Sequence, residues 1–557
     1  MRKKFACRPG LAVAGLIVFA FGASGKTPSK ISRDLDGGKG VRDVIVQFNG
    51  RVTEQKHSKV KSKGGSFKQE LPGISAGVYK LPLSQLDSLS DDPDVRYISP
   101  DRPVRGSLEF ATPAIGGAIA RSYGWTGRDV GIAVIDSGLG NSSDVTSGSG
   151  PRVVHQEAIY PAGSTADGYG HGTPVASAAA GNGDMSSGRY TGVAPEASLI
   201  IFRVLDDQGF GTDSGVIAAI DRAIALKSQY NIRVLNLSLG RPVFESYQTD
   251  PLCQAVERAW NAGIVVVVAA GNEGRNNTQG NDGYATITSP GNDPLVITVG
   301  AMRDMETITR ADDLIASYSS KGPTLLDHVV KPDIVAPGNQ IVAARGSGSS
   351  YLSTLYPANL VPVQYFRLSG TSLAAPMVSG SAALLIQKTP SITPDQVKAR
   401  LMRTATKTFP LYSTVVDGSN VYTSQYDLFT IGAGYLDVWA ALNDTTTGAS
   451  ALGAAASPTA APDPVTGEVV VVNTQNAVWG SNAVWGSNAV WGSNAVWGSS
   501  VFVSGANAVW GSNAVWGSNA VWGSNAVWGS NAVWGSNAVW GSSTPAAQAR
   551  VTSEGDH

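Results

Sequence analysis

Five short apolar runs recur between positions 131 and 301, and each is too apolar for either face of a strand to lie in water. Strands of this kind need cover on both sides, which is typical of a parallel sheet enclosed by helices. Helical patterns at 214–229 and 251–263 lie between the runs. The alternation predicts an α/β fold with a doubly wound, mostly parallel sheet and helices on both faces. The runs are GIAVID (131–136), SLIIFRVL (198–205), VLNLSL (234–239), GIVVVVAAG (263–271) and VITVGA (296–301).

Four residues that can carry chemistry stand where strands end or helices begin. Asp136 closes the first run and Asn272 follows the fourth, while His171 lies between two glycines at a helix entry. Ser372 opens a helical pattern of small residues. Taken singly, turns explain the acid and the amide, packing explains the imidazole, and close helix packing explains the serine. Together, at the carboxyl ends of one sheet, these groups indicate nucleophilic catalysis.

Residues 112–445, about three-fifths of the chain, resemble the subtilisin-like serine proteases, the subtilase family. The order Asp, His, Ser along the chain is also that of subtilisin. Six ordered motifs carry the resemblance, and they imply the subtilisin-like version of the doubly wound fold. These motifs are AVIDSGLG (133–140), GHGTPVAS (170–177), LNLSLG (235–240), AAGNEG (269–274), KPDIVAPG (331–338) and GTSLAAP (370–376).

The resemblance implies acyl transfer by these residues. Ser372 attacks a peptide carbonyl, His171 takes and returns its proton, and Asp136 fixes the imidazole tautomer. Asn272 and the backbone N–H of Ser372 form the oxyanion hole. The segments that resemble the substrate-binding segments of subtilases hold small or apolar side chains, which favours an apolar residue before the cut. The expected substrate-binding residues are Gly209, Gly211, Ser238, Leu239, Gly240, Ala269, Ala270 and Gly271.

No cofactor is required for this chemistry, and no metal ligand is expected among the site residues. Many subtilases bind calcium through acidic loops, and this chain has the acidic pairs Asp206-Asp207 and Asp312-Asp313. Neither pair shows the ligand spacing of a calcium loop, so a structural calcium ion stays an open alternative.

The N-terminal region has two predicted parts. Residues 1–24 follow the order of a secretory signal peptide, with basic residues, an apolar run and small residues. An uncleaved anchor is the alternative. Residues 41–105 resemble the α+β, ferredoxin-like propeptide of subtilases, which implies an intramolecular inhibitor and folding aid removed by cleavage between Arg105 and Gly116. A permanent accessory domain is the other interpretation of this segment.

The C-terminal region is low in complexity. Residues 446–475 have the Ala, Pro and Thr content of a linker, and the unit NAVWGS occurs ten times within 476–542, before a polar end at 543–557. The tryptophans predict a repetitive β-structure that binds a cell-surface polymer or associates with itself. A loosely structured expanded repeat is the alternative.

Composition limits the partners. The formal net charge is −1, and no basic run suggests nucleic acid binding. No transmembrane span is expected. With Cys7 in the signal, Cys253 is left without an intrachain partner and is expected to be buried. The sequence therefore predicts a secreted serine endopeptidase acting on proteins and peptides, made as a self-processing zymogen. The alternatives are a catalytically silent subtilase fold and a repeat-based surface or adhesion protein.

Overall fold

The computed structural model describes most of the chain between residues 30 and 472. The predicted signal peptide and the NAVWGS repeats lie outside the described residues, as does part of the expected cleavage interval. The described residues are 30–32, 35, 40–101, 103–106, 111–146, 152–159, 163–278, 281–305, 307–362, 364–417, 420–446, 451–462, 469–472 and 555–556.

The main sheet has eight strands in the order β14-β13-β12-β10-β6-β8-β7, with β15 also paired to β13. All pairings are parallel except that of β14 with β13. The first strand, β6, lies in the middle, and later strands are added on both sides of it, so the predicted doubly wound sheet is confirmed. The strands are β6 (Gly131–Asp136), β7 (Val153–Ala158), β8 (Ser198–Arg203), β10 (Ile232–Leu237), β12 (Val265–Ala269), β13 (Ile297–Arg303), β14 (Leu314–Ile315) and β15 (Ile334–Pro337).

Two pairs of helices enclose this sheet. Helices α6 (Asp213–Tyr230) and α7 (Pro251–Asn261) pack together, as do α5 (Gly172–Ala180) and α9 (Thr371–Lys388). Every residue of β6 and β12 is buried, which requires cover on both faces of the sheet. The helix α9 is itself buried almost throughout, because its small residues let it pack closely against strands β10, β12 and β13.

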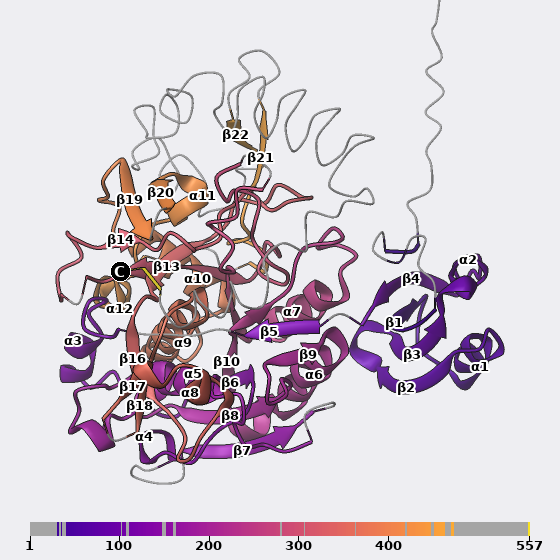
Figure 1. The fold of residues 1–557 in the computed structure, drawn as a ribbon, viewed down its shortest axis with the longest axis horizontal. Helices are drawn as coiled ribbons and strands as arrows, with labels where there is room; N and C mark the ends of the chain where they lie inside the picture. Colours follow the sequence, from indigo (N-terminus) through magenta and orange to yellow (C-terminus); the bar gives the residue numbers. More distant parts are fainter. Residues whose placement is uncertain are drawn as a thin grey trace, which may run out of the picture.

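The N-terminal module, residues 41–101, is a separate lobe beside the body that contains the main sheet (Figure 1). Its elements follow the order βαββαβ, and its antiparallel sheet has the order β2-β3-β1-β4. This is the ferredoxin-like arrangement that the sequence predicts. The module has its own apolar core. Its main elements are β1 (Val41–Phe48), α1 (Glu54–Ser62), β2 (Ser66–Leu71), β3 (Ala76–Pro82), α2 (Leu86–Ser90) and β4 (Val95–Pro100).

Smaller elements surround the two cores. One three-stranded sheet has the order β11-β5-β9 and another the order β16-β18-β17, while β19 pairs with β20 and β21 with β22. These elements are β5 (Pro103–Gly106), β9 (Phe210–Thr212), β11 (Leu239–Gly240), β16 (Ile341–Ala344), β17 (Leu360–Val361), β18 (Tyr365–Leu368), β19 (Tyr412–Asp417), β20 (Asn420–Gln425), β21 (Thr459–Pro462), β22 (Val469–Val472), α3 (Gly117–Ser122), α4 (Ser143–Thr146), α8 (Tyr351–Leu355), α10 (Pro394–Thr404), α11 (Leu428–Ile431) and α12 (Val438–Asn443).

The segment that composition marks as a linker makes specific contacts with the body that contains the main sheet. The Ala455 N–H donates to Asp395 Oδ1 over 2.9 Å, and Ser457 Oγ donates to Asp333 Oδ1 over 2.5 Å. The Ala460 N–H donates to the His328 carbonyl over 2.8 Å. Residues rich in alanine suit a linker and a close-packed surface equally well, so composition does not separate the two cases.

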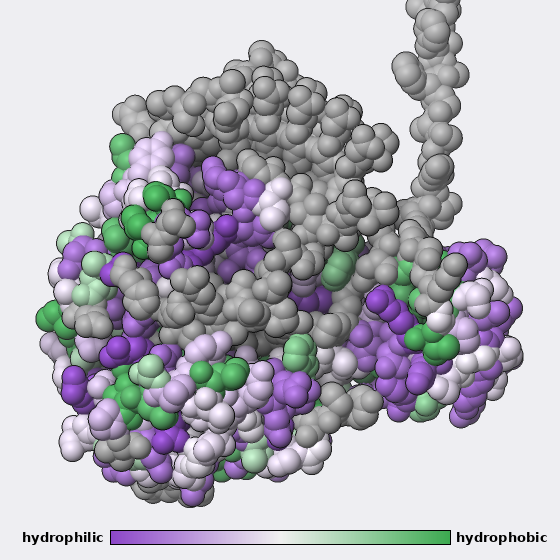
Figure 2. Space-filling view, in the orientation of Figure 1, coloured by the Kyte–Doolittle hydropathy of each residue, from purple (hydrophilic) through white to green (hydrophobic). Residues whose placement is uncertain are grey.

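The surface visible in Figure 2 is mainly hydrophilic over the N-terminal module, with small scattered hydrophobic patches. None of the helices in the described part of the chain combines the length and the apolar character that a membrane span needs.

Candidate active site

Asp136 and His171 form a buried hydrogen-bonded pair. Asp136 is the last residue of β6, and His171 immediately precedes α5. His171 Nδ1 lies 2.5 Å from Asp136 Oδ1, and both side chains are 0% exposed. The carboxylate can only accept, so Nδ1 carries the proton and Nε2 is left as the basic nitrogen. Among the described residues, Nε2 has no hydrogen-bond partner. The pair therefore presents an imidazole in the tautomer that a general base needs.

Asp167 holds the loop that carries the imidazole, and the sequence motifs do not single it out. Its carboxylate accepts five hydrogen bonds, which come from Ser137, Gly170, His171 and Thr173. The bond from the Thr173 N–H, at 2.8 Å, satisfies a free donor at the start of α5, where His171 makes no side-chain cap. The sequence signal that could have revealed Asp167 is an acidic residue shortly before a helix of small residues.

Ser372 is the second residue of α9 and is 3% exposed. Gly370, the residue just before α9, has φ +153°, a backbone conformation that residues with side chains rarely adopt. Its N–H donates to the Gly338 carbonyl over 2.8 Å. The serine thus lies in the first turn, where backbone N–H groups lack intrahelical acceptors and favour negative charge.

Pro376 lies inside α9, as its sixth residue, and has no backbone N–H. The missing N–H would have bonded the carbonyl four residues back, which is that of Ser372 itself. The Ser238 hydroxyl donates to this carbonyl instead, and it accepts from the Asn236 amide over 2.9 Å. Ser238, expected to bind substrate, therefore points its side chain at the first turn of α9, which carries Ser372 and is called the serine turn below.

Asn272 lies beside the serine turn, in the loop after β12. Its Oδ1 accepts from the Thr371 N–H over 2.9 Å and from the Thr371 hydroxyl over 3.1 Å. The Thr371 hydroxyl oxygen also accepts a hydrogen bond from the Gly271 N–H over 3.1 Å. With its oxygen engaged by Thr371, the Asn272 amide has only its nitrogen to offer as a donor for a substrate.

The expected substrate-binding segments border a strand of the chain itself. β5 is inserted between β9 and β11 in antiparallel pairing. Val104 pairs with Gly211, Arg105 with Gly240 and Gly106 with Leu239. β9 and β11 thus hold an extended segment between them through backbone hydrogen bonds, and the space that β5 fills is called the groove below.

The other expected substrate-binding residues lie just before β9 or at the end of β12 and directly after it. Gly209, with φ +82°, precedes β9, and an added Cβ would lie 2.6 Å from the Tyr169 ring. Ala269 ends β12, and the Ala270 N–H donates to the Val299 carbonyl over 3.0 Å. At Gly271, an added Cβ would lie 2.8 Å from both Thr288 and Ser320, which explains the need for glycine there.

Residues 127–434, more than half of the chain, match the family model described as the Subtilase family. The chain is a subtilase. It is accordingly a subtilisin-like serine protease, as the sequence motifs predict.

Individual relatives agree with this assignment. Serine protease AprX of Bacillus subtilis (strain 168) is 38% identical over 384 residues, which cover 67% of the subtilase and 82% of AprX. Subtilisin E of the same strain is 33% identical over 373 residues, covering 66% and 85% of the two chains.

A solved structure is similar in fold. It is that of fervidolysin from Fervidobacterium pennivorans, described as a keratinolytic enzyme related to subtilisin, with a TM-score of 0.55 and 23% identity. The match covers 75% of the subtilase and 63% of the fervidolysin chain. At this identity the likeness supports the fold alone.

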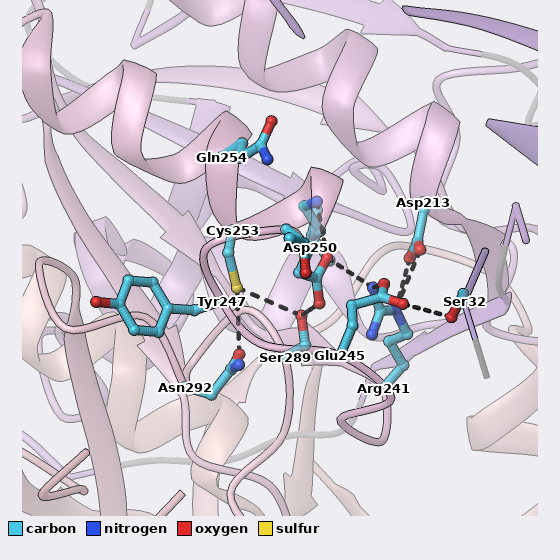
Figure 3. Close-up of polar contacts among 12 residues, drawn as sticks. Ser32, Asp213, Arg241, Glu245, Tyr247, Asp250, Cys253, Gln254, Ser289 and Asn292 are labelled. Atoms are coloured by element: carbon cyan, nitrogen blue, oxygen red, sulfur yellow. Dashed lines mark hydrogen bonds and ion pairs between the residues drawn. The ribbon is translucent and has the colours of Figure 1, made fainter. Parts of the chain in front are cut away.

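A buried polar cluster connects the groove of the subtilase to the N-terminal module (Figure 3). Arg241 follows β11, and its guanidinium lies 3.0 Å from Asp213 and 2.7 Å from Asp250. Glu245 accepts hydrogen bonds from Ser32, over 2.5 Å, and from Tyr97 of the module, over 3.1 Å. The two carboxylates compensate the buried cation, and Glu245 offers an acceptor to the module.

Cys253 lies at the edge of the same cluster and is buried, as expected (Figure 3). Its Sγ lies 3.3 Å from Asn292 Oδ1. Burial raises the pKa of the thiol well above its ordinary value, so the residue is held as an unreactive neutral thiol.

Three of the four acidic side chains considered for calcium, Asp206, Asp207 and Asp312, are bonded to protein groups. Asp206 Oδ1 accepts from the backbone of Gln208 and Phe210, and Asp207 lies 2.6 Å from Arg203. Asp312 accepts from the Thr307 hydroxyl. The described residues contain no group of three or more acidic, His or Cys side chains arranged to hold a metal ion. These pairs do not fit a calcium loop, and no step below uses a metal.

Proposed function

We propose that this subtilase is a secreted serine endopeptidase that cleaves proteins through an acyl-enzyme formed on Ser372. The observation that carries the proposal is the buried pair of His171 Nδ1 and Asp136 Oδ1, 2.5 Å apart. This pair stands at the start of α5, which packs directly against α9, the helix whose first turn holds Ser372. A general base fixed in one tautomer, together with a serine in the first turn of the helix that packs against α5, suits acyl transfer.

In the proposed mechanism, His171 Nε2 takes the proton of the Ser372 hydroxyl as Oγ attacks the peptide carbonyl. The Asp136 carboxylate stabilises the resulting imidazolium through Nδ1. The oxyanion forms at the start of α9, where the Ser372 N–H and the Asn272 amide nitrogen donate to it. The imidazolium then gives its proton to the leaving amine, and water repeats the sequence on the acyl-enzyme to release the carboxylic acid.

Asn272→Ala tests the oxyanion part of this mechanism. We expect kcat for a peptide amide to fall about 10²–10³-fold with little change in KM, because the donor acts on the transition state. That magnitude is known from subtilisin. The measurement is steady-state hydrolysis of a chromogenic peptide, with Asn276→Ala, in the same loop, as the matched control. An unmodified protein that does not cleave peptides, or a variant with unchanged kcat, would contradict the proposal.

We also propose that the N-terminal module is a propeptide that inhibits the enzyme until it is cut off. The insertion of β5 between β9 and β11 supports this role, since it fills the groove expected for substrates. Additional contacts fasten the module to α6 and α7. Asp101 Oδ1 accepts from the Ser214 N–H at the start of α6, over 2.7 Å, and Arg96 donates to Gln254 over 2.7 Å. Secretion rests on the signal-like N-terminus.

Asp101 should make inhibition by the module depend on pH. Burial raises the pKa of its carboxyl from 3.8 to about 6 in the docked state. Docking therefore takes up a proton, so affinity is greatest below about pH 4 and falls as pH rises towards 6. The affinity of the module falls about 100-fold in total, because the pKa of Asp101 differs by about two units between the free and docked states. The measurement is the inhibition constant of separately added residues 30–105 between pH 4 and 7.

The matched control is the same module with Asp101→Asn. Dividing the two inhibition constants removes the pH dependence of the protease itself. We expect this ratio to change about 100-fold across the range. A ratio that is constant with pH would contradict the assignment to Asp101.

The role of the tail stays a prediction. Its repeats lie outside the described residues, and binding to a cell-surface polymer or to other copies is proposed from the tryptophan content alone.

A further inference from the structure

A dipeptide far beyond the catalytic motifs is buried in the catalytic body. Asp556 is 1% exposed, and its carboxylate is held by three donors. Arg275 Nη2, the Ser317 N–H and the Ser317 hydroxyl each lie 2.6 Å from a carboxylate oxygen. Arg275 also donates to Ser317 Oγ over 2.7 Å and pairs with Asp417 over 3.0 Å. The guanidinium is therefore already oriented by other partners, which favours recognition of a carboxylate.

The backbone of the dipeptide is recognised as well. The Asn339 side chain, 1% exposed, accepts from the Asp556 N–H over 2.8 Å and donates to the Asp556 carbonyl over 3.0 Å. One amide thus satisfies both polar groups of the bound residue, as a neighbouring strand would. Gly555 has φ +64°, and an added Cβ would collide with Ser369 Oγ and Asn339 Oδ1. The site therefore selects Gly-Asp by charge, by backbone pairing and by shape.

The site adjoins the catalytic loops. Asn339 follows Gly338, whose carbonyl accepts from the Gly370 N–H over 2.8 Å, two residues before Ser372. Arg275 lies three residues after Asn272, in a loop where the Gly274 N–H donates to the Tyr318 carbonyl over 2.8 Å. The dipeptide is thus bound by the segments that flank the serine turn and the Asn272 loop.

We propose that Arg275, Ser317 and Asn339 form an internal peptide-binding site that fastens Gly555–Asp556 to the catalytic body. The chain before the repeats is fixed at Ala455, Ser457 and Ala460 by the contacts described above. Residues 473–554, including the NAVWGS repeats, are accordingly attached to the protease at both ends. A break in the repeats then leaves the C-terminal piece bound by contacts that survive the loss of the covalent link.

The test uses the full chain with Ser372→Ala, which prevents self-cleavage, and a recognition sequence for a sequence-specific protease placed at 500–506, between the two repeat blocks. After cleavage, gel filtration shows whether the C-terminal fragment travels with the rest. We expect retention in this protein and loss with Asp556→Ala or Gly555→Ala. Glu554→Gln is the control for the change in charge, and it should retain the fragment. A melting curve of each variant before cleavage verifies that the catalytic body is folded.

A competition experiment tests the same site without any substitution in Gly555–Asp556 or in the residues that bind it. A free peptide with the sequence of residues 551–557 should displace the cleaved fragment. The same peptide with Asn in place of Asp556 should be about 10- to 100-fold weaker, as expected for the loss of charge-assisted hydrogen bonds. Equal retention with and without Asp556, or equal potency of the two peptides, would overturn the proposal. Persistent retention would then point to association of the repeats.

Discussion

The Ser372→Ala variant should keep the mass of the uncut chain and hydrolyse peptides about 10⁶-fold more slowly than the unmodified protein. This magnitude is the one known for loss of the nucleophile in subtilisin. The substitution removes the attacking oxygen but leaves the donors at the start of α9 and the Asp136–His171 pair in place. Residual catalysis from binding and oxyanion stabilisation is therefore expected. Intact mass and casein digestion on the same samples measure processing and activity together.

Ser381→Ala is the matched control for this experiment. Ser381 lies on the same helix and is equally buried, but its hydroxyl only donates to the Met377 carbonyl over 2.7 Å. Loss of this local bond should leave both processing and activity intact. If Ser372→Ala loses its N-terminal region as the unmodified protein does, the nucleophile lies elsewhere or processing is done by another protease. If the unmodified protein neither matures nor cleaves casein, the silent-fold alternative is favoured.

Asp136→Asn should lower kcat about 10⁴-fold, the figure known for the corresponding substitution in trypsin-like enzymes. An amide in place of the carboxylate can turn its NH₂ group towards His171 Nδ1. The imidazole would then carry its proton on Nε2, where a general base must accept one. The fold should tolerate the change because the two side chains are nearly equal in size. The measurement is kcat for a peptide substrate, with the melting temperature recorded alongside.

The control is Asp129→Asn, an exposed residue just before β6, the strand that ends at Asp136. Its φ of +64° suits asparagine as well as aspartate, so activity and stability should both be unchanged. A value of kcat for Asp136→Asn within tenfold of the unmodified protein would contradict the role of the carboxylate in fixing the tautomer.

The sequence predicted the central architecture because inner strands of the main sheet, such as β6 and β12, are buried on both faces and therefore read as continuous apolar runs. The sequence singled out Asp136, His171, Asn272 and Ser372 as candidate site residues because they stand in short ordered motifs where strands end or helices begin. The ferredoxin-like arrangement of the N-terminal module was implied by its resemblance to subtilase propeptides. These features depend on neighbouring residues, which a sequence displays directly.

Features that depend on distant residues were missed. Asp167 is defined by the donors that converge on it, and Ser238 by a carbonyl that Pro376 leaves without its helical partner. The dipeptide Gly555–Asp556 has no motif of its own, since Arg275 and Asn339, far away in the chain, create its site. Contacts of the alanine-rich segment were missed for the same reason. Long-range pairing, rather than local pattern, decides these cases.

Under the proposed inhibitory role of the N-terminal module, the position of β5 between β9 and β11 has a consequence for latency. A strand joined covalently to the groove it occupies competes with outside peptides at an effective concentration on the order of millimolar. Substrates of proteases commonly have KM values of about 1 μM to 1 mM, so most would be outcompeted even if β5 bound weakly as a free peptide. Breaking a single bond ends this advantage, because the segment then leaves at its own dissociation rate and is diluted. Latency is thus set by chain connectivity more than by the strength of any one contact.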